Sequence, residues 1–100
     1  MSDMKLYTIR RRDFWGTPEE LQASAQKSAE VGDEMTDDIR WIRTYVVQEP
    51  SGKLGTVCIY EGTSPEKVRE QAERAGMPAD EITEVVDTVV VRPDPAPAAV

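Results

Sequence analysis

Histidine is missing from this chain of 100 residues, and cysteine occurs only once, as Cys58. Without histidine, the chain lacks the most common metal ligand of proteins and the most common general base near neutral pH. Ser–His–Asp and Cys–His catalysis are therefore excluded, and we expect no metal site. A single cysteine cannot form an internal disulfide, so we expect a cytoplasmic protein.

Long hydrophobic runs and an excess of positive charge are also missing. No stretch approaches the run of about 18 apolar residues that a transmembrane helix needs. Residues 1–5 lack the apolar core of a signal peptide. The 12 Lys and Arg residues are outnumbered by 19 Asp and Glu residues, which gives a net charge of −7. Nucleic acids and anionic membranes repel such a chain, so we expect neither as a partner.

Local patterns divide the sequence into strands and helices. Two helix starts carry a capping hydroxyl before proline, at Thr17-Pro18 and at Thr63-Ser64-Pro65, where either hydroxyl can cap. Glu20 completes a capping box with Thr17. Apolar and β-branched residues that alternate with polar ones predict strands. The predicted strands cover residues 4–12, 39–47, 54–61 and 82–91.

The order strand, helix, strand, strand, helix, strand is that of the split βαβ plan. We therefore predict one α+β domain over residues 1–92, with a ferredoxin-like βαββαβ topology. Its antiparallel sheet is expected to carry both helices on one face. Residues 93–100 are rich in proline and alanine and predict a disordered tail.

The second and third strands predict a face that carries half of the aromatic side chains of the chain. A hairpin closing around residues 50–53 places Tyr45 opposite Cys58 and Val46 opposite Val57. We predict that the residues sharing this face line a ligand-binding pocket. They are Trp41, Arg43, Tyr45, Cys58 and Tyr60. Because the helices are expected on the other face, a second copy stacking sheet to sheet would cover this one. The sequence therefore predicts a homodimer through the sheet face.

Arg43 and Cys58 are the chemically distinctive members of this predicted face. A guanidinium among aromatic side chains can bind a carboxylate or phosphate by paired hydrogen bonds, or it can form an ion pair with Asp or Glu of a second subunit. Cys58 is either a reactive thiol beside Arg43 or a small buried hydrophobic residue, and we favour the second interpretation. We thus expect a small anionic or aromatic ligand and no cofactor.

Several stretches of the chain resemble a known family. They are residues 39–46 (IRWIRTYV), 56–61 (TVCIYE), 64–70 (SPEKVRE) and 75–85 (AGMPADEITEV). In these stretches the chain is similar to small bacterial proteins of unknown function described as nickel-binding-protein-like. The resemblance implies a ferredoxin-like subunit that dimerises into an α+β barrel. One branch of the family binds nickel through histidine and acidic residues, and this chain lacks the histidines.

Three classes of function are compatible with the sequence. The first is a small-ligand-binding or interaction module with a pocket on the sheet face, which the aromatic residues favour. The second is a nickel-binding protein, as the resemblance implies. The third is a cofactor-independent enzyme, by analogy with other α+β barrels. The sequence singles out no catalytic residue.

Overall fold

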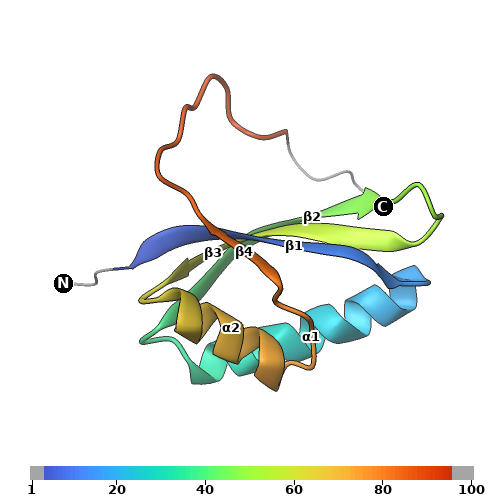
Figure 1. Ribbon diagram of the computed structural model, residues 1–100, viewed down its shortest axis with the longest axis horizontal. Helices are drawn as coiled ribbons and strands as arrows, with labels where there is room; N and C mark the ends of the chain where they lie inside the picture. Colours follow the sequence, from blue (N-terminus) through green and yellow to red (C-terminus); the bar gives the residue numbers. More distant parts are fainter. Residues whose placement is uncertain (1–3, 96–100) are drawn as a thin grey trace.

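The computed structural model of the protein describes residues 4–95, and it has the predicted order of elements. The elements are β1 (Lys5–Trp15), α1 (Pro18–Glu34), β2 (Ile39–Gln48), β3 (Leu54–Gly62), α2 (Pro65–Arg74) and β4 (Glu81–Glu84). The four strands form one antiparallel sheet in the order β2-β3-β1-β4. Both helices lie on the same face of this sheet (Figure 1). The predicted α+β, ferredoxin-like fold is confirmed.

The hydroxyl caps form as the sequence predicts, whereas Glu20 bonds the residue before the N-cap and not the N-cap itself, as a capping box would require. Thr17 Oγ1 accepts a hydrogen bond of 3.2 Å from the backbone N–H of Glu20, and the Glu20 carboxylate accepts one of 2.9 Å from Gly16. Ser64 caps α2 in the same way, through Lys67. The hydroxyls of Thr17 and Ser64 thus satisfy backbone donors that the first turn of each helix leaves free. No helix within residues 4–95 is long and apolar enough to span a membrane.

The hydrophobic core lies between the helices and the face of the sheet that they cover. Tyr7 and Ile9 of β1, Tyr60 of β3 and Val68 of α2 are each at most 2% exposed. We call this side of the sheet the helix-facing side, and the opposite side the open face. Since the core needs only the helices to close it, the aromatic residues that line it do not require a second copy of the chain.

The hairpin of β2 and β3 differs from its predicted register by one residue. Thr44 lies opposite Cys58, and Tyr45 lies opposite Val57. The register of β2 against β3 shifts by one residue between positions Trp41 and Arg43 of β2, as a β-bulge requires. The extra residue in β2 reverses the alternation of side chains beyond it.

This bulge separates the residues that were expected on one face. Trp41, Cys58 and Tyr60 are on the helix-facing side, whereas Arg43 and Tyr45 are on the open face. The prediction of a shared aromatic face is therefore wrong, although each residue lies in a predicted strand. The cause is local backbone geometry, which period-two counting cannot detect.

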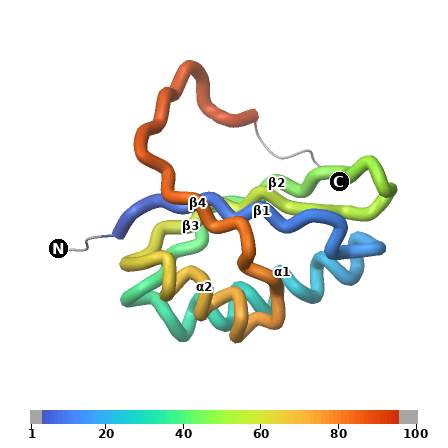
Figure 2. Tube along the Cα trace, in the orientation of Figure 1, coloured from blue at the N-terminus to red at the C-terminus, as the bar shows by residue number. Residues whose placement is uncertain are grey.

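The last strand is shorter than predicted, because β4 ends at Glu84 rather than at Val91. Residues 85–95 leave the sheet and arch above the open face, and Figure 2 shows this arm clearly. Four of its valines are at least 75% exposed: Val86, Val89, Val90 and Val91. Within residues 4–95, the last backbone hydrogen bond between this part of the chain and the sheet is that from the N–H of Val85 to the carbonyl oxygen of Leu6, at 2.8 Å. Of the tail expected to be disordered, residues 96–100 lie outside the described residues.

Candidate ligand-binding pocket

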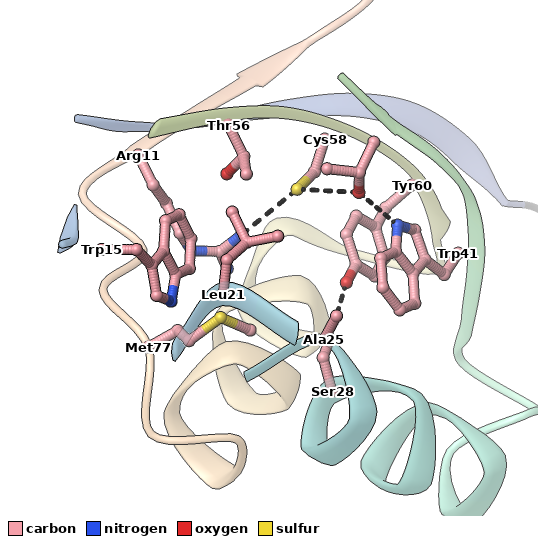
Figure 3. Close-up of a pocket in the computed structure, with 11 residues that line it drawn as sticks. Arg11, Trp15, Leu21, Ala25, Ser28, Trp41, Thr56, Cys58, Tyr60 and Met77 are labelled. Carbon is pink, nitrogen blue, oxygen red and sulfur yellow. Dashed lines mark hydrogen bonds between the residues drawn. The ribbon is translucent and has the colours of Figure 1, made fainter. Parts of the chain in front are cut away.

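A cavity of about 30 Å³ lies between the helix-facing side of the sheet and α1 (Figure 3). We call it the helix-side pocket. Most of its wall is apolar or aromatic, from Trp15, Leu21, Ala25, Trp41 and Met77. Its one charged lining residue is Arg11 of β1. An apolar cavity with few polar groups is the usual form of a small-molecule site.

Arg11 is only 2% exposed. Its Nε donates to the carbonyl oxygen of Pro78 at 2.8 Å, and its Nη1 donates to the Sγ of Cys58 at 3.4 Å. Its Nη2 is buried without a hydrogen-bond partner, and no carboxylate within residues 4–95 forms an ion pair with this guanidinium. Arginine remains cationic in proteins. A buried charge without a counter-charge is unfavourable, so an acceptor in the cavity would stabilise it.

Thr56 brings a second unsatisfied polar group to the same wall. It is the cross-strand partner of Arg11 in the pairing of β1 with β3, and it is 2% exposed. Its Oγ1 is buried without a partner in the described part of the chain. The pocket therefore contains two neighbouring groups, a guanidinium nitrogen and a hydroxyl, that can bind one ligand acceptor.

Cys58 lies between two donors. Thr44 Oγ1 is 3.2 Å from the Sγ of Cys58 and itself accepts a hydrogen bond of 2.8 Å from Trp41 Nε1. Arg11 approaches the sulfur with its Nη1. The cation beside Cys58 is thus Arg11 and not Arg43, which corrects the sequence interpretation.

Tyr60 forms a rigid part of the wall. Its ring stacks on Trp41 with centroids 5.8 Å apart and an interplanar angle of 2°. Its hydroxyl shares a hydrogen bond of 3.0 Å with Ser28, which also accepts one from Gln71. Burial raises the pKa of Tyr60 to about 12, and the hydrogen bond with Ser28 opposes this shift. The phenol is therefore neutral at physiological pH.

Arg43 and Tyr45 face a different space, a hollow of about 620 Å³ between the open face and the arm. Both contact the Asp94 carboxylate of the arm. The hydrogen bond from Tyr45, together with that from Arg43, lowers the pKa of Asp94. Arg43 therefore forms an ion pair, but its partner comes from the same chain and not from a second subunit as expected.

The predicted pocket was expected on the face away from the helices, whereas Trp41, Cys58 and Tyr60 line a cavity on the helix-facing side. The sequence prediction did not include Arg11, Thr44 and Thr56, which line the same cavity. Arg11 left a signal, because it follows Tyr7 and Ile9 at every second position and thus shares their buried face. Thr44 left none, since its place depends on the bulge.

Two acidic residues that precede β2, Glu34 and Asp38, pair with basic or hydroxyl side chains. Asp38 accepts a hydrogen bond from Thr63 and lies 3.8 Å from Lys67, and Glu34 pairs with Arg74. Within residues 4–95, no three or more Cys, Asp or Glu side chains are grouped to hold a metal ion.

Comparison with known proteins identifies the family. The structure resembles the crystal structure of SCO4226 from Streptomyces coelicolor A3(2), with 27% sequence identity and a TM-score of 0.68. The alignment covers 84% of this chain and 99% of that one. No curated protein matches the chain. The family model described as "Nickel responsive protein SCO4226-like" matches residues 7–85. The chain therefore belongs to the SCO4226-like family of nickel responsive proteins.

Proposed function

We propose that this protein binds a small anionic ligand in the helix-side pocket. The observation that carries the proposal is the buried Nη2 of Arg11, which has no partner within residues 4–95. An anion would receive a charge-assisted hydrogen bond from this nitrogen and a second one from the hydroxyl of Thr56. The apolar lining strengthens both interactions because it excludes water.

The size of the pocket restricts the ligand. A cavity needs roughly 10–15 Å³ to hold one water molecule, so about 30 Å³ accommodates an anion of a few atoms. Formate and halide ions meet this limit. A larger carboxylate would have to displace Trp41, whose indole also lines a surface hollow of about 300 Å³ beside α1.

Fluorescence offers a direct test, since both tryptophans of the chain line the pocket. Titration of the tag-free protein with formate should change the emission in a saturable manner. Arg11→Leu should abolish this change. Arg12→Leu is the matched control, because Arg12 is an exposed neighbour that pairs with Glu81 at 2.9 Å. A response of equal size and midpoint in Arg11→Leu would refute the proposal.

We also propose that two copies associate through the open face. This face and the arm present apolar side chains, including Tyr45 at 45% exposed and Val89 at 84%. Leu6, Ile42 and Ile59 line the hollow beside them. Contiguous exposed apolar surface of this kind usually marks an interface.

Nickel binding is the second candidate function, and the description of the family supports it. The described residues do not fit a nickel site within one chain. Cys58 is the one thiol, and its sulfur contacts the cationic guanidinium of Arg11, which repels a divalent cation. Such a site would need donors from a second copy. Calorimetric titration of tag-free protein with Ni²⁺ separates the candidates, because stoichiometric tight binding would favour the metal function.

A further inference from the structure

We propose a reaction of the helix-side pocket in addition to binding: Cys58 is oxidised there by hydrogen peroxide to a sulfenic acid. The inference rests on Cys58, Arg11 and Thr56, which line the same cavity. It uses the proposed pocket but does not depend on anion binding.

The geometry would bring both reactants, the sulfur of Cys58 and hydrogen peroxide, to the guanidinium of Arg11. Nη1 of Arg11 already contacts the sulfur at 3.4 Å, and Nη2 of the same group is unpartnered within residues 4–95. A peroxide oxygen that accepts from Nη2 would therefore lie beside the sulfur. The Thr56 hydroxyl provides a second hydrogen bond to peroxide. Holding two reactants in contact removes much of the entropic cost of their encounter.

The dimensions of the cavity select the oxidant. Cys58 is 4% exposed, and the space beside it is about 30 Å³. Hydrogen peroxide is uncharged and has two heavy atoms, so it fits where bulky thiol reagents do not. The pocket thus predicts reactivity toward peroxide without general thiol reactivity.

The reaction balances with peroxide as the sole oxidant. A sulfur lone pair attacks one peroxide oxygen, and the S–O bond forms as the O–O bond breaks. The other oxygen leaves as hydroxide and takes the thiol proton, which yields water. Sulfur is oxidised by two electrons and peroxide is reduced by two. The guanidinium of Arg11 stabilises the negative charge on the departing oxygen.

The product has a defined fate. Cys58 is the one cysteine of the chain, so its sulfenic acid cannot form an internal disulfide. Reduction then requires an external thiol, which condenses with the sulfenic acid and releases water before a second thiol restores Cys58. The oxidised state would persist until such a thiol enters.

The test follows sulfenic acid formation in reduced, tag-free protein. After exposure to hydrogen peroxide, catalase stops the reaction, and the protein is unfolded in dimedone, which labels sulfenic acids. Peptide mass spectrometry should find the adduct at Cys58. In parallel, the folded protein should react with Ellman's reagent at least about tenfold more slowly than the unfolded protein, because access is restricted. Arg11→Leu should slow the peroxide reaction about tenfold or more, whereas Arg12→Leu should not change it.

Three outcomes would overturn the inference. They are no adduct at Cys58, an unchanged peroxide rate in Arg11→Leu, or reactions with peroxide and with Ellman's reagent that are slowed by the same factor in the folded protein relative to the unfolded protein. The last would indicate reaction through local opening. Should Arg11→Leu not fold, Arg11→Lys replaces it, since an ammonium cannot span sulfur and peroxide as the fork does. Its peroxide rate should also fall. Formation of the adduct without any formate response would refute anion binding and leave this inference standing.

Discussion

Arg11 is an arginine at a strand position whose neighbours in the alternation, Tyr7 and Ile9, are core residues. Two of its five N–H donors form the hydrogen bonds to Pro78 and Cys58. The guanidinium therefore retains hydrogen-bonding capacity inside an apolar wall. A leucine would be a simpler core residue. The guanidinium therefore has a stronger explanation in ligand chemistry than in stability.

Arg11→Leu should consequently leave the free energy of unfolding unchanged or raise it by about 1–2 kcal/mol, because an uncompensated buried charge is removed. The lost hydrogen bond to Pro78 offsets part of this gain, at about 1 kcal/mol. Urea unfolding monitored by circular dichroism measures the difference. A destabilisation above about 3 kcal/mol would instead assign Arg11 a structural role.

Tyr60 predicts a loss of stability at alkaline pH. Its pKa is raised from 10.0 to about 12 in the fold, so the stabilisation is complete below pH 10 and is lost as the pH rises through about 12. Two pKa units correspond to roughly 3 kcal/mol. Tyr60→Phe should reduce this alkaline loss, while it weakens the fold near neutral pH by about 1 kcal/mol through the lost hydrogen bond to Ser28. Unfolding curves recorded near neutral pH and at alkaline pH compare the wild type with Tyr60→Phe. An identical loss of stability at alkaline pH in the two proteins would contradict the assignment of this loss to Tyr60.

The bulge in β2 is the element-level feature that forms the pocket. Without the extra residue near Ile42, the alternation would bring Arg43 and Tyr45 to the helix-facing side. Thr44 would then face away from Cys58. With the bulge, Thr44 connects Trp41 to the sulfur, and the large polar side chains lie on the open face.

Gly55 in β3 should tolerate no side chain. An added Cβ would lie 2.1 Å from Glu49 Oε2 and 2.5 Å from the backbone oxygen of Arg11. Gly55→Ala should therefore lower the free energy of unfolding by about 1–3 kcal/mol. Gly32→Ala in α1 is the matched control, since nothing lies within 4 Å of its Cβ, and it should stabilise the helix by up to about 1 kcal/mol. Thermal unfolding of both variants checks the contrast, and equal effects would contradict it.

At the level of the whole molecule, the arm and the open face leave apolar side chains exposed. The strand pattern of residues 82–91 continues beyond Glu84, but in the described structure β4 ends there and the exposed valines of the arm belong to no strand. Exposed valines next to a hollow over the sheet favour a second copy as the cover.

The protein should accordingly be dimeric at micromolar concentration, as measured by sedimentation or light scattering. Ile59→Lys places a charge on the open face, where Ile59 lines the hollow, and it should shift the equilibrium to monomer. Arg12→Leu again serves as the control. A wild-type protein that remains monomeric at high concentration would exclude the proposed interface.

The contact of the arm with Arg43 and Tyr45 should depend on pH. Because the pKa of Asp94 is lowered below its ordinary value of 3.8, the contact is present above that value and is lost as the pH falls through the lowered pKa. Asp94→Asn should weaken it at neutral pH. NMR signals of the arm valines report both changes, and Asp87→Asn is the control. The overall stability should scarcely change, since the ion pair is exposed.

The sequence was sufficient to predict the order of the elements, the helix starts and the α+β class. Each of these depends on interactions between residues a few positions apart. The capping of α1 by Thr17 and of α2 by Ser64 are such local effects. The same alternation carries a signal for Arg11, which follows Tyr7 and Ile9 at every second position, although the sequence analysis did not use it. The family resemblance agreed with this fold and is confirmed over residues 7–85.

The pocket, in contrast, depends on contacts between distant parts of the chain. The bulge near Ile42 is set by how β2 pairs with β3, and it decides that Trp41 and Thr44 accompany Cys58 while Arg43 faces Asp94. That Arg11 meets Cys58 and Thr56 depends on the pairing of β1 with β3. Alternation along one strand cannot specify these contacts, because cross-strand register and the position of a bulge are settled by the packing of the whole sheet.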